Sequence, residues 1–514
     1  MEDLPLGKSR LADCTRNDQP RRVDTVFRDC ARRYRDRPAL TAQERSLTYG
    51  ELDDVSDQVA LTLRREGVRT GEYVAFSVLH REDAVIAMLG ILKAGCAYVP
   101  IEALEDESKA SELLRIAQVR GLMRARGRND FRFSHVSRPE GCRLELEPHA
   151  ARIAGNVGDG DAVACLMFTS GTTAGRKAVM VPHRGILRLV DRPHYIELTP
   201  DIVMLQLAPV TFDASAFEIW GTLLTGGRLV LYPDRTVDPR LLERVIESER
   251  VNTVWLTSGL FHALASNRAG LFAPLRTLLT GGDVVRPERV RQVFELFPHI
   301  RIVNGYGPTE NSTFTCCHAM SSDEDIGDSI PIGTPITGTS VYVLDSEMVP
   351  VPDGDEGELY CSGLGVACGY LGAPQLTAER FIAAPWDRNE ILYRTGDWVR
   401  ARSDGALVFL GRRDDQVKVR GHRIQLGEIQ QAIRSIDLVE EAVVDFVRNE
   451  TGNRLVAHVQ MNAAGEQTSV EIKAALREVL PPYEVPDVIR ITSALELTQS
   501  GKLKRNIAYE PMAD

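Results

Sequence analysis

The feature that most constrains the fold of this chain is an alternation of short apolar runs with helical patterns. The apolar runs that predict β-strands are residues 72–79, 164–168, 201–208, 228–232, 251–256, 275–282 and 301–307. After the first run, EDAVIAMLGILKAG (82–95) predicts a helix that ends at a glycine. Alternation of this kind predicts largely parallel sheets with helices packed on their faces.

Four loops that follow predicted strands are rich in glycine, hydroxyl and acidic residues. They are TSGTT (169–173), TFDAS (211–215), TGGD (280–283) and GYGPTE (305–310). Ligands of parallel sheets bind beyond the carboxyl ends of the strands. We therefore expect these loops to converge on one crevice.

After about residue 328 the pattern changes. The stretch 340–363 is rich in β-forming residues and turns, and it predicts an antiparallel or barrel-like unit. Further on, two predicted helices (428–435 and 469–480) and two predicted strands (440–448 and 454–461) indicate a small separate α+β domain. The predicted fold class is therefore α/β, with a large N-terminal domain of parallel-type sheets flanked by helices plus a β-barrel-like unit, followed by this small domain.

Charge and cysteine content oppose several classes of protein. The chain has 514 residues and a formal net charge of −11, whereas nucleic-acid binders usually carry basic patches. It has no apolar run long enough to span a bilayer, and its first ten residues lack the apolar core of a secretory signal. Its nine cysteines include no C-x-x-C pair, which favours idle thiols in a reducing cytosol over a cysteine-bound metal. We therefore expect a cytoplasmic protein without nucleic-acid or membrane partners.

The stretch FTSGTTAGRK (168–177) has the composition of a phosphate-binding loop. Its hydroxyl groups and its glycine suit a loop that wraps pyrophosphate oxygens. The residues concerned are Thr169, Ser170, Gly171 and Thr172. The spacing differs from the G-x-x-x-x-G-K-[ST] loop, because Ala178 stands where a magnesium-binding hydroxyl would be. A plain Ser/Thr turn is the alternative.

The stretch NGYGPTE (304–310) suggests a site for a nucleotide base and a cation. Tyr306 lies between two glycines, so its ring could stack on a purine while Asn304 reads the edge of the base. Glu310 could bind Mg²⁺, a hard cation that prefers carboxylate and phosphate oxygens. The alternative is a tight turn with a chance acid.

Three further charged residues are weak signals when each is taken alone. Asp397 follows a glycine turn in YRTGDW and could accept both hydroxyls of a ribose. Lys502 follows a glycine in TQSGKLKR, where a solvated lysine is the alternative. Asp213 ends a predicted strand in FDASAF, where a carboxylate would select a cation and a helix N-cap is the alternative.

In their order and amino-acid sequence, these stretches resemble the adenylation domains of nonribosomal peptide synthetases, within the adenylate-forming superfamily. The resemblance covers residues 22–507. Its ordered motifs are LTYGEL (47–52), LKAGCAYVPIE (92–102), FTSGTTAGRKA (168–178), FDAS (212–215), NGYGPTE (304–310), GELYCSGLGVACGYL (357–371), YRTGDW (393–398), GRRDDQVKVRGHRIQLGEI (411–429), LPPYEVP (480–486) and SGKLKR (500–505). The family usually has Thr-Gly-x-Pro-Lys-Gly where residues 173–178 read Thr-Ala-Gly-Arg-Lys-Ala.

The resemblance implies an ATP-dependent ligase whose first step is attack of a carboxylate on the α-phosphorus of ATP, with loss of pyrophosphate. By resemblance the catalytic residues are Lys502, which bridges the substrate carboxylate and the α-phosphate, and Glu310, which holds Mg²⁺. The implied ATP-binding residues are Thr169, Ser170, Gly171, Thr172, Lys177, Asn304, Tyr306, Gly307, Thr309, Asp397 and Arg412.

The implied second step transfers the acyl group to a phosphopantetheine thiol that a separate peptidyl carrier protein supplies. The resemblance also implies that the C-terminal domain is mobile about a hinge at Asp414, which divides the chain into residues 1–413 and 414–514. We expect the motion to remove Lys502 from the site and to bring in the loop that contains Gly421 and His422. A small helper protein is a further candidate partner.

The implied substrate is a small aliphatic amino acid whose α-ammonium group pairs with Asp213. Carried over position by position, the substrate-binding residues are Asp213, Ala214, Phe217, Trp255, Leu279, Gly281, Gly305, Thr313, Phe314 and Lys502. Apart from Thr313 and the two charged residues, these side chains are apolar, and Phe217 and Trp255 fill much of the space. Valine is the first expectation, followed by 2-aminobutyrate, isoleucine and alanine.

The ends of the chain favour a stand-alone enzyme, and two rival functions are weighed against it. No carrier-domain motif follows Arg505 and Met1 looks like a natural start, so a stand-alone enzyme of natural-product biosynthesis, such as that of an antibiotic, is expected. One rival is an acyl- or aryl-CoA ligase of the same superfamily, which Asp213 opposes. The other is a non-catalytic nucleotide-binding homologue, which the presence of Lys502 and Glu310 opposes.

Overall fold

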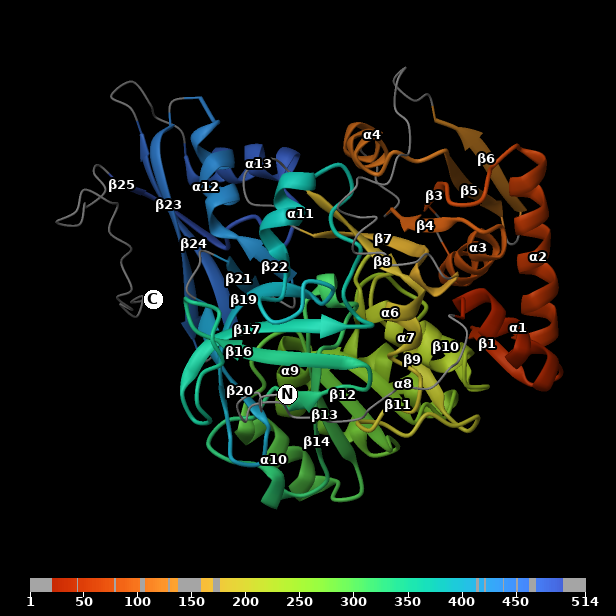
Figure 1. Cartoon of the computed structure of the whole chain (residues 1–514), viewed down its shortest axis with the longest axis horizontal. Helices are drawn as coiled ribbons and strands as arrows, with labels where there is room; N and C mark the ends of the chain where they lie inside the picture. The colour runs from red at the N-terminus through yellow and green to blue at the C-terminus, as the bar shows by residue number, and fades with distance from the viewer. Residues whose placement is uncertain are drawn as a thin grey trace.

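The structure is a computed structural model. It describes residues 21–43, 45–77, 80–101, 107–127, 130–136, 159–169, 176–412, 416–419, 422–437, 439–449, 452–461 and 468–492. These residues form a large N-terminal domain of three sheets and a smaller C-terminal domain, drawn in blue in Figure 1. The predicted α/β fold class is confirmed. Within these ranges no helix is long and apolar enough to cross a membrane, and seven cysteines are free thiols.

The first sheet has six strands in the order β6-β5-β3-β4-β7-β8. Its four central strands pair in parallel, and the two edge strands are antiparallel. The strands are β3 (Tyr73–Ser77), β4 (Ala97–Pro100), β5 (Gly121–Gly127), β6 (Asp130–His135), β7 (Val163–Thr169) and β8 (Lys177–Pro182). The predicted phosphate loop lies between β7 and β8, where Thr169 pairs with Lys177 and residues 170–175 are outside the described ranges.

The second sheet has nine strands in the order β15-β14-β13-β12-β11-β9-β10-β1-β2. The strands from β13 to β1 in this order run parallel, and the three strands at the edges are antiparallel. The strands are β1 (Pro38–Ala42), β2 (Arg45–Thr48), β9 (Val203–Gln206), β10 (Arg228–Leu231), β11 (Thr253–Thr257), β12 (Thr277–Gly281), β13 (Arg301–Tyr306), β14 (Cys316–Met320) and β15 (Thr334–Pro335). From β9 the chain crosses to β10 on one side and then to β11 on the other. This reversal opens a crevice beyond the carboxyl end of β9.

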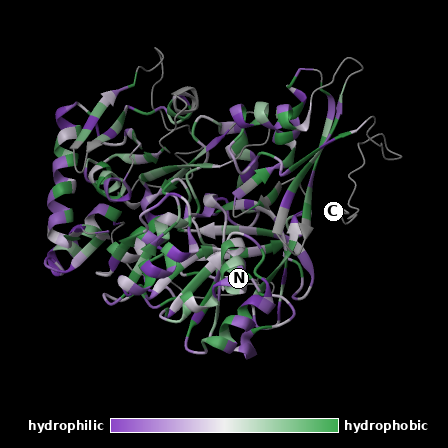
Figure 2. Cartoon of the chain, turned by 180° about the vertical axis from the view of Figure 1, so that it is seen from behind, coloured by the Kyte–Doolittle hydropathy of each residue, from purple (hydrophilic) through white to green (hydrophobic). Residues whose placement is uncertain are grey.

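Two core helices lie between these sheets, and other helices cover their outer faces. α3 (Arg81–Lys93) and α7 (Ala214–Leu223) are buried along almost their whole lengths, as expected for helices that are apolar on every side. They pack in one core with residues of both sheets, and Figure 2 shows hydrophilic residues gathering on outer helices. The other α-helices among the described residues of the domain are α1 (Val23–Arg33), α2 (Tyr49–Arg65), α4 (Glu107–Ile116), α6 (His183–Leu187), α8 (Pro239–Ser248), α9 (Ser258–Asn267), α10 (Pro287–Leu296) and α11 (Pro374–Arg380).

The third sheet is antiparallel, with the order β16-β17-β19-β18 and with β20 paired to β19. Its strands are β16 (Thr339–Leu344), β17 (Glu356–Gly363), β18 (Phe381–Ala383), β19 (Ile391–Ala401) and β20 (Leu407–Arg412). The antiparallel pairing predicted for residues 340–363 is therefore confirmed. The sheet brings Asp397 on β19 opposite Arg412 on β20 as register partners.

The C-terminal domain has its own apolar core, which includes Ile429, Ile433, Leu455 and Leu476. Its elements are β21 (Gln416–Val419), β22 (His422–Gln425), α12 (Leu426–Arg434), β23 (Val439–Asn449), β24 (Gly452–Met461), α13 (Ser469–Val479) and β25 (Val488–Thr492). The two helices and two strands predicted here are confirmed, and β25 adds a third strand, parallel to β24. Asp414 lies outside the described residues, so the boundary at 413/414 stays a prediction.

Close packing of α2 against α3 depends on Gly90. A Cβ atom on Gly90 would lie 2.3 Å from Val59 Cγ1 and 3.0 Å from the carbonyl oxygen of Ser56. Val59 is β-branched and stiff at χ1, so it cannot turn away without cost. The two helices would have to separate to admit a side chain at this position.

We predict that Gly90→Ala lowers the free energy of unfolding by about 1–3 kcal/mol because it overpacks this contact. The matched control is Gly259→Ala in α9, where an added Cβ meets no atom within 4 Å. There alanine should raise the free energy of unfolding by up to about 1 kcal/mol through helix propensity. Urea denaturation of both variants measures the difference, and equal stabilisation at the two positions would contradict the packing of α2 on α3.

Candidate functional site

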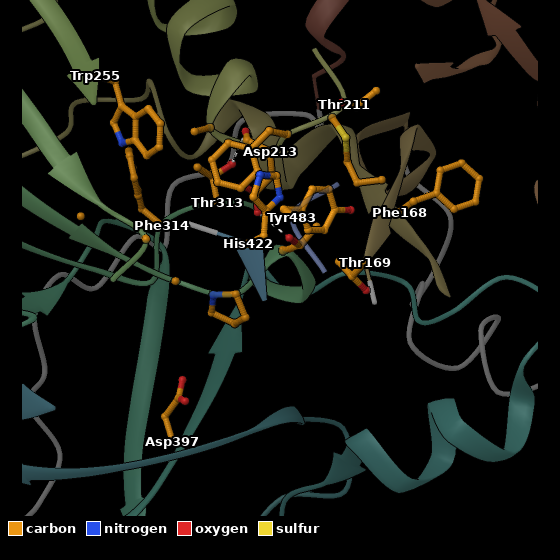
Figure 3. A pocket seen from close by; sticks show the side chains of 18 of the residues that line it. Phe168, Thr169, Thr211, Asp213, Trp255, Thr313, Phe314, Asp397, His422 and Tyr483 are labelled. Atoms are coloured by element: carbon orange, nitrogen blue, oxygen red, sulfur yellow. Dashed lines mark hydrogen bonds between the residues drawn. The ribbon is translucent and has the colours of Figure 1, made fainter. Parts of the chain in front are cut away.

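The crevice beyond the parallel strands is lined by residues from both domains (Figure 3). Predicted site residues that line it are Thr169, Asp213, Ala214, Trp255, Gly305, Gly307, Thr309, Thr313, Phe314, Asp397 and Arg412. The loops that follow β9, β12 and β13 contribute, together with the end of β7, so the expected convergence is present for these three loops. The loop that follows β7 lies outside the described residues.

The remaining predicted residues fall into two groups. Those outside the described residues are Ser170, Gly171, Thr172, Asp414, Gly421 and Lys502. Those that are described but lie behind or beside the crevice lining are Lys177, Phe217, Leu279, Gly281, Asn304, Tyr306 and Glu310. The roles assigned to both groups stay predictions.

Asp213 faces the crevice from the start of α7. It occupies the N-cap position of this helix, yet its side chain caps no backbone amide. Its Oδ2 accepts a hydrogen bond from Thr309 Oγ1 at 2.5 Å, and its carbonyl oxygen accepts one from Thr313 Oγ1 at 3.0 Å. The helix-cap alternative for this carboxylate is therefore wrong. The strand prediction for 201–208 was also too long, because β9 ends at Gln206.

Aromatic side chains form an apolar wall close to Asp213. Trp255 on β11 is the register partner of Leu279 on β12, and its ring lies 5.6 Å from that of Phe212. The ring of Phe314 lies 5.3 Å from that of Phe217, which is fully buried on α7. In Figure 3, Trp255 and Phe314 lie on one side of the crevice and Phe168 lies on the other.

Two glycines let this wall approach the sheet. Gly281 on β12 and Gly305 on β13 are register partners, and a Cβ on Gly281 would lie 2.0 Å from the carbonyl oxygen of Gly305. A Cβ on Gly305 would lie 2.6 Å from the ring of Phe314. Any larger residue at Gly305 would push Phe314 into the crevice.

Asp397 is fixed by a phenol and a guanidinium. Tyr306 donates a hydrogen bond to its Oδ2, and Arg412 donates one to its Oδ1 at 2.5 Å. Burial, and then the charge of Asp397, raises the pKa of Tyr306 well above its usual value, so the phenol stays a neutral donor. The ring of Tyr306 packs on Phe409. Sequence reasoning missed this bond between Tyr306 and Asp397, because the two residues lie in motifs far apart in the chain.

Asn304 is oriented by a backbone contact. Its Nδ2 donates to the carbonyl oxygen of Pro331 at 2.8 Å, and its side chain is almost fully buried on β13. This bond fixes the plane of the amide with its oxygen as an acceptor. An acceptor is what a base with an exocyclic amino group requires.

Glu310 belongs to a polar cluster beside the phosphate loop. Tyr370 donates a hydrogen bond to Glu310 Oε1 at 2.8 Å, and Lys177 Nζ lies 5.5 Å from the centre of the Tyr370 ring. Thr169 Oγ1 is buried and finds no hydrogen-bond partner among the described residues. A carboxylate, an ammonium and an unpartnered hydroxyl together suit phosphate oxygens and the hard Mg²⁺ ion that accompanies them.

Comparison with known proteins decides the family. The AMP-binding enzyme family matches residues 27–371, and the C-terminal domain of AMP-binding enzymes matches residues 428–502. The chain belongs to the AMP-binding enzyme family. Within this family it is similar to the adenylation domains of nonribosomal peptide synthetases, and it is an adenylating ligase as predicted. Adenylating enzymes of this family use ATP.

Three relatives illustrate the similarity. A linear gramicidin synthase protein of Brevibacillus parabrevis is 40% identical over 97% of this chain, which spans 6% of that protein. An artificially fused adenylation–PCP di-domain, NpsA-ThdA of Klebsiella oxytoca, is 29% identical with a TM-score of 0.81, over 92% of this chain and 94% of that one. Klebsiella oxytoca NpsA in complex with 3-hydroxyanthranilyl-AMSN is 30% identical with a TM-score of 0.67, over 94% and 98%. The chain thus spans a small part of its curated relative.

The C-terminal domain of this adenylating enzyme reaches the crevice through two rings. His422 of β22 stacks on Tyr483 at 3.8 Å with an interplanar angle of 4°, and it lies 5.7 Å from Phe212 (Figure 3). Arg176, beside the phosphate loop, donates to Tyr483 Oη at 3.3 Å. The sequence predicted that His422 enters the site and that the loop with Thr211 and Phe212 lines it, but it assigned no role to these two residues and missed Tyr483 and Phe168.

Glu484 adds a titratable group to this contact between domains. It is 6% exposed, and burial raises its pKa to about 7 while Arg176 acts to lower it. A raised carboxyl pKa means that the folded state binds the proton more tightly than the unfolded state. The stability that the folded state gains by binding this proton is fully present below pH 4.5, the ordinary pKa of a glutamate. It is lost as the pH rises through about 7.

We predict that the melting temperature falls between pH 5.5 and 8 and that Glu484→Gln reduces this fall, because the amide carries no charge to desolvate. The pH-dependent part of the free energy of unfolding that Glu484→Gln removes amounts to roughly 1–3 kcal/mol. Thermal unfolding at the two pH values measures it. Glu478→Gln, on the exposed face of α13, is the matched control and should leave the fall as in the wild type. An unchanged fall in Glu484→Gln would contradict the assignment.

Proposed function

We propose that this enzyme activates a small aliphatic amino acid, valine first, as an aminoacyl-adenylate. It then transfers the aminoacyl group to the phosphopantetheine thiol of a carrier protein. The observation that carries the proposal is the carboxylate of Asp213, set in the crevice beside an apolar wall. The three parts of the substrate are thereby recognised separately, as an ammonium group, an apolar side chain and a carboxylate.

Recognition of the ammonium group rests on Asp213. A carboxylate in apolar surroundings is costly without a cation, so the site selects strongly for a charged amine. Thr309 Oγ1 donates a hydrogen bond to the carboxylate of Asp213, and Thr313 Oγ1 donates one to its backbone carbonyl oxygen, so the residue is held toward the crevice. Fatty and aryl acids lack the amine that this proposal pairs with Asp213.

Recognition of the side chain rests on Trp255 and Phe314, with Ala214 beside them. Phe217 and Leu279 close the pocket from behind. The described lining offers apolar surface and little room, which favours a branched aliphatic group of moderate size. One methylene in such a pocket is worth about 1–3 kcal/mol, so partial acceptance of 2-aminobutyrate, isoleucine and alanine is expected.

ATP would occupy the part of the crevice between Thr169 and Asp397. We assign the ribose to Asp397 and Arg412, the adenine to Tyr306 and Asn304, and the β- and γ-phosphates to Thr169 and the loop that follows it, with Lys177 nearby. Glu310 would hold Mg²⁺, which neutralises charge on the phosphate oxygens when it is bound. Gly307 and Thr309 lie along the same edge of the crevice.

The first step needs no general base, since the attacking carboxylate is ionised at neutral pH. One of its oxygens forms a bond to the α-phosphorus, the bond from that phosphorus to the bridging oxygen breaks, and pyrophosphate leaves with the electron pair. Negative charge gathers around the α-phosphate in this step. We assign its stabilisation to Lys502, whose ammonium group approaches from the C-terminal domain.

The second step forms the thioester. The carrier thiol releases its proton to solvent and the sulfur forms a bond to the acyl carbon. The bond from that carbon to the phosphate oxygen breaks, and AMP leaves with the electron pair. The stack of His422 and Tyr483 at the crevice supports a domain arrangement suited to this step.

We predict that ATP–pyrophosphate exchange over a panel of amino acids is fastest with valine. Lys502→Ala should slow exchange by at least about 100-fold, because charge at the α-phosphate loses its cation. Asp213→Asn should lower kcat/KM for the amino acid by about 100-fold and leave the KM for ATP nearly unchanged. Thermal unfolding of both variants checks that they are folded.

Other outcomes of this assay identify the rival functions. Exchange with aryl or fatty acids, followed by acyl transfer to coenzyme A, would indicate a CoA ligase. ATP binding without exchange for any acid would indicate a non-catalytic homologue.

We predict that Asp414→Pro uncouples the two steps, because proline fixes the backbone φ angle at the proposed hinge. Pyrophosphate exchange should persist, while loading of a phosphopantetheinylated carrier protein should fall at least about tenfold. Mass spectrometry of the loaded carrier measures the second step. Loss of both activities in a folded variant would count against a hinge at this position.

A further inference from the structure

Arg188 is a buried cation behind the crevice. It follows α6, and only 3% of its surface is exposed. Burial lowers its pKa to about 10, still well above neutrality, so the guanidinium remains charged. A buried charge is costly unless hydrogen bonds compensate it. The first-step mechanism above makes no use of this residue.

The partners of Arg188 belong mainly to one short segment. Its Nη2 donates to the carbonyl oxygen of Asn311, to that of Ser312 at 3.2 Å and to that of Phe314 at 2.7 Å. Its Nη1 donates to Thr339 Oγ1. One nitrogen of the guanidinium thus gathers three carbonyl groups of residues 311–314, while the other nitrogen anchors it to Thr339.

This segment has an unfavourable backbone. Ser312 and Thr313 are consecutive residues in the left-handed region, with φ angles of 50° and 74°. Such a conformation is costly for residues other than glycine, and most of all for a β-branched threonine. It persists where neighbouring groups over-determine it. The hydrogen bonds from Arg188 supply that constraint.

Two glycines allow Arg188 and the turn to pack closely. A Cβ on Gly365 would lie 2.3 Å from its guanidinium, and a Cβ on Gly185 would lie 2.2 Å from Ser312 Oγ. Ser312 Oγ in turn donates to the carbonyl oxygen of Gly365 at 2.7 Å. The turn and the arginine are therefore packed as one unit.

The turn carries two residues of the substrate site. Thr313 bonds the backbone of Asp213, and Phe314 supplies the apolar wall. We propose that Arg188 is a positioning residue of the acid-substrate pocket, which holds the strained turn at Ser312–Thr313 so that Thr313 and Phe314 face Asp213. The identity of the substrate in this inference rests on the proposed function. The position of the turn does not depend on it.

The test compares Arg188→Met and Arg188→Lys with Lys93→Met. Lys93 is a matched control, because it is another buried cation, paired with Asp53 and Asp57 far along the chain from the turn. In Arg188→Met, kcat/KM for the acid substrate should fall about 10- to 100-fold through KM, while the KM for ATP changes by less than about twofold. Discrimination between valine and isoleucine should weaken. Arg188→Lys should recover part of the loss, since it keeps the charge but not the fork.

Hydrogen exchange gives a readout that does not depend on which acid is activated. Amides of residues 309–315, including Thr315, whose N–H bonds the carbonyl of Tyr306 at 2.7 Å, should exchange faster in Arg188→Met than in the wild type or in Lys93→Met. Unchanged exchange in this segment together with an unchanged KM would overturn the proposal. If Arg188→Met does not fold, the same two measurements on Arg188→Lys decide it. Failure of the wild type to activate any amino acid would overturn the proposed function. The hydrogen-exchange measurement would then still test the role of Arg188.

Discussion

The reversal of strand order at β9 is the constraint on which the site depends. Parallel strands deliver their following loops to one edge of a sheet, and a reversal leaves a crevice at that edge. Residues as far apart in sequence as Asp213, Trp255 and Gly307 therefore meet there, and β7 of the first sheet adds Thr169. The antiparallel sheet closes the far side with Asp397 and Arg412, which are paired across β19 and β20 before any ligand arrives.

The two carboxylates of the crevice are held in different ways, and the difference fits different ligands. Asp397 is already matched by Arg412 and accepts a bond from the phenol of Tyr306, so it suits neutral hydroxyl groups. Asp213 accepts a hydrogen bond from the hydroxyl of Thr309, and we propose it for the ammonium group of the acid substrate. Both depend on residues of the stretch that begins at Tyr306, so the geometry of this stretch couples the proposed nucleotide and acid sites.

Most crevice residues were predicted from the resemblance to adenylation domains. The sequence itself predicted seven strands of the parallel sheets, the helix at 82–95 and the elements between 428 and 480, because hydrophobic periodicity is a local property. It failed where a residue acts through distant contacts. Tyr483 meets Arg176 across 307 positions, and nothing local signals that contact. Arg188 looks like one more basic residue near a short helix, although it is almost fully buried. The position of Asp213 was predicted, but only the folded structure could show that its side chain does not cap α7.

The division of labour between the domains follows from the two proposed steps. The aminoacyl-adenylate must stay bound between the two steps. Bonds form and break at the α-phosphorus in the first step and at the acyl carbon in the second. Groups that hold the acid and the nucleotide are therefore best placed on the rigid domain, where Arg188 and Arg412 are locked by buried hydrogen bonds. A cation needed for one step only is best placed on a part that can leave. The stack of His422 on Tyr483 occupies the crevice wall in this arrangement, and a lysine arriving from the same domain would require the stack to withdraw.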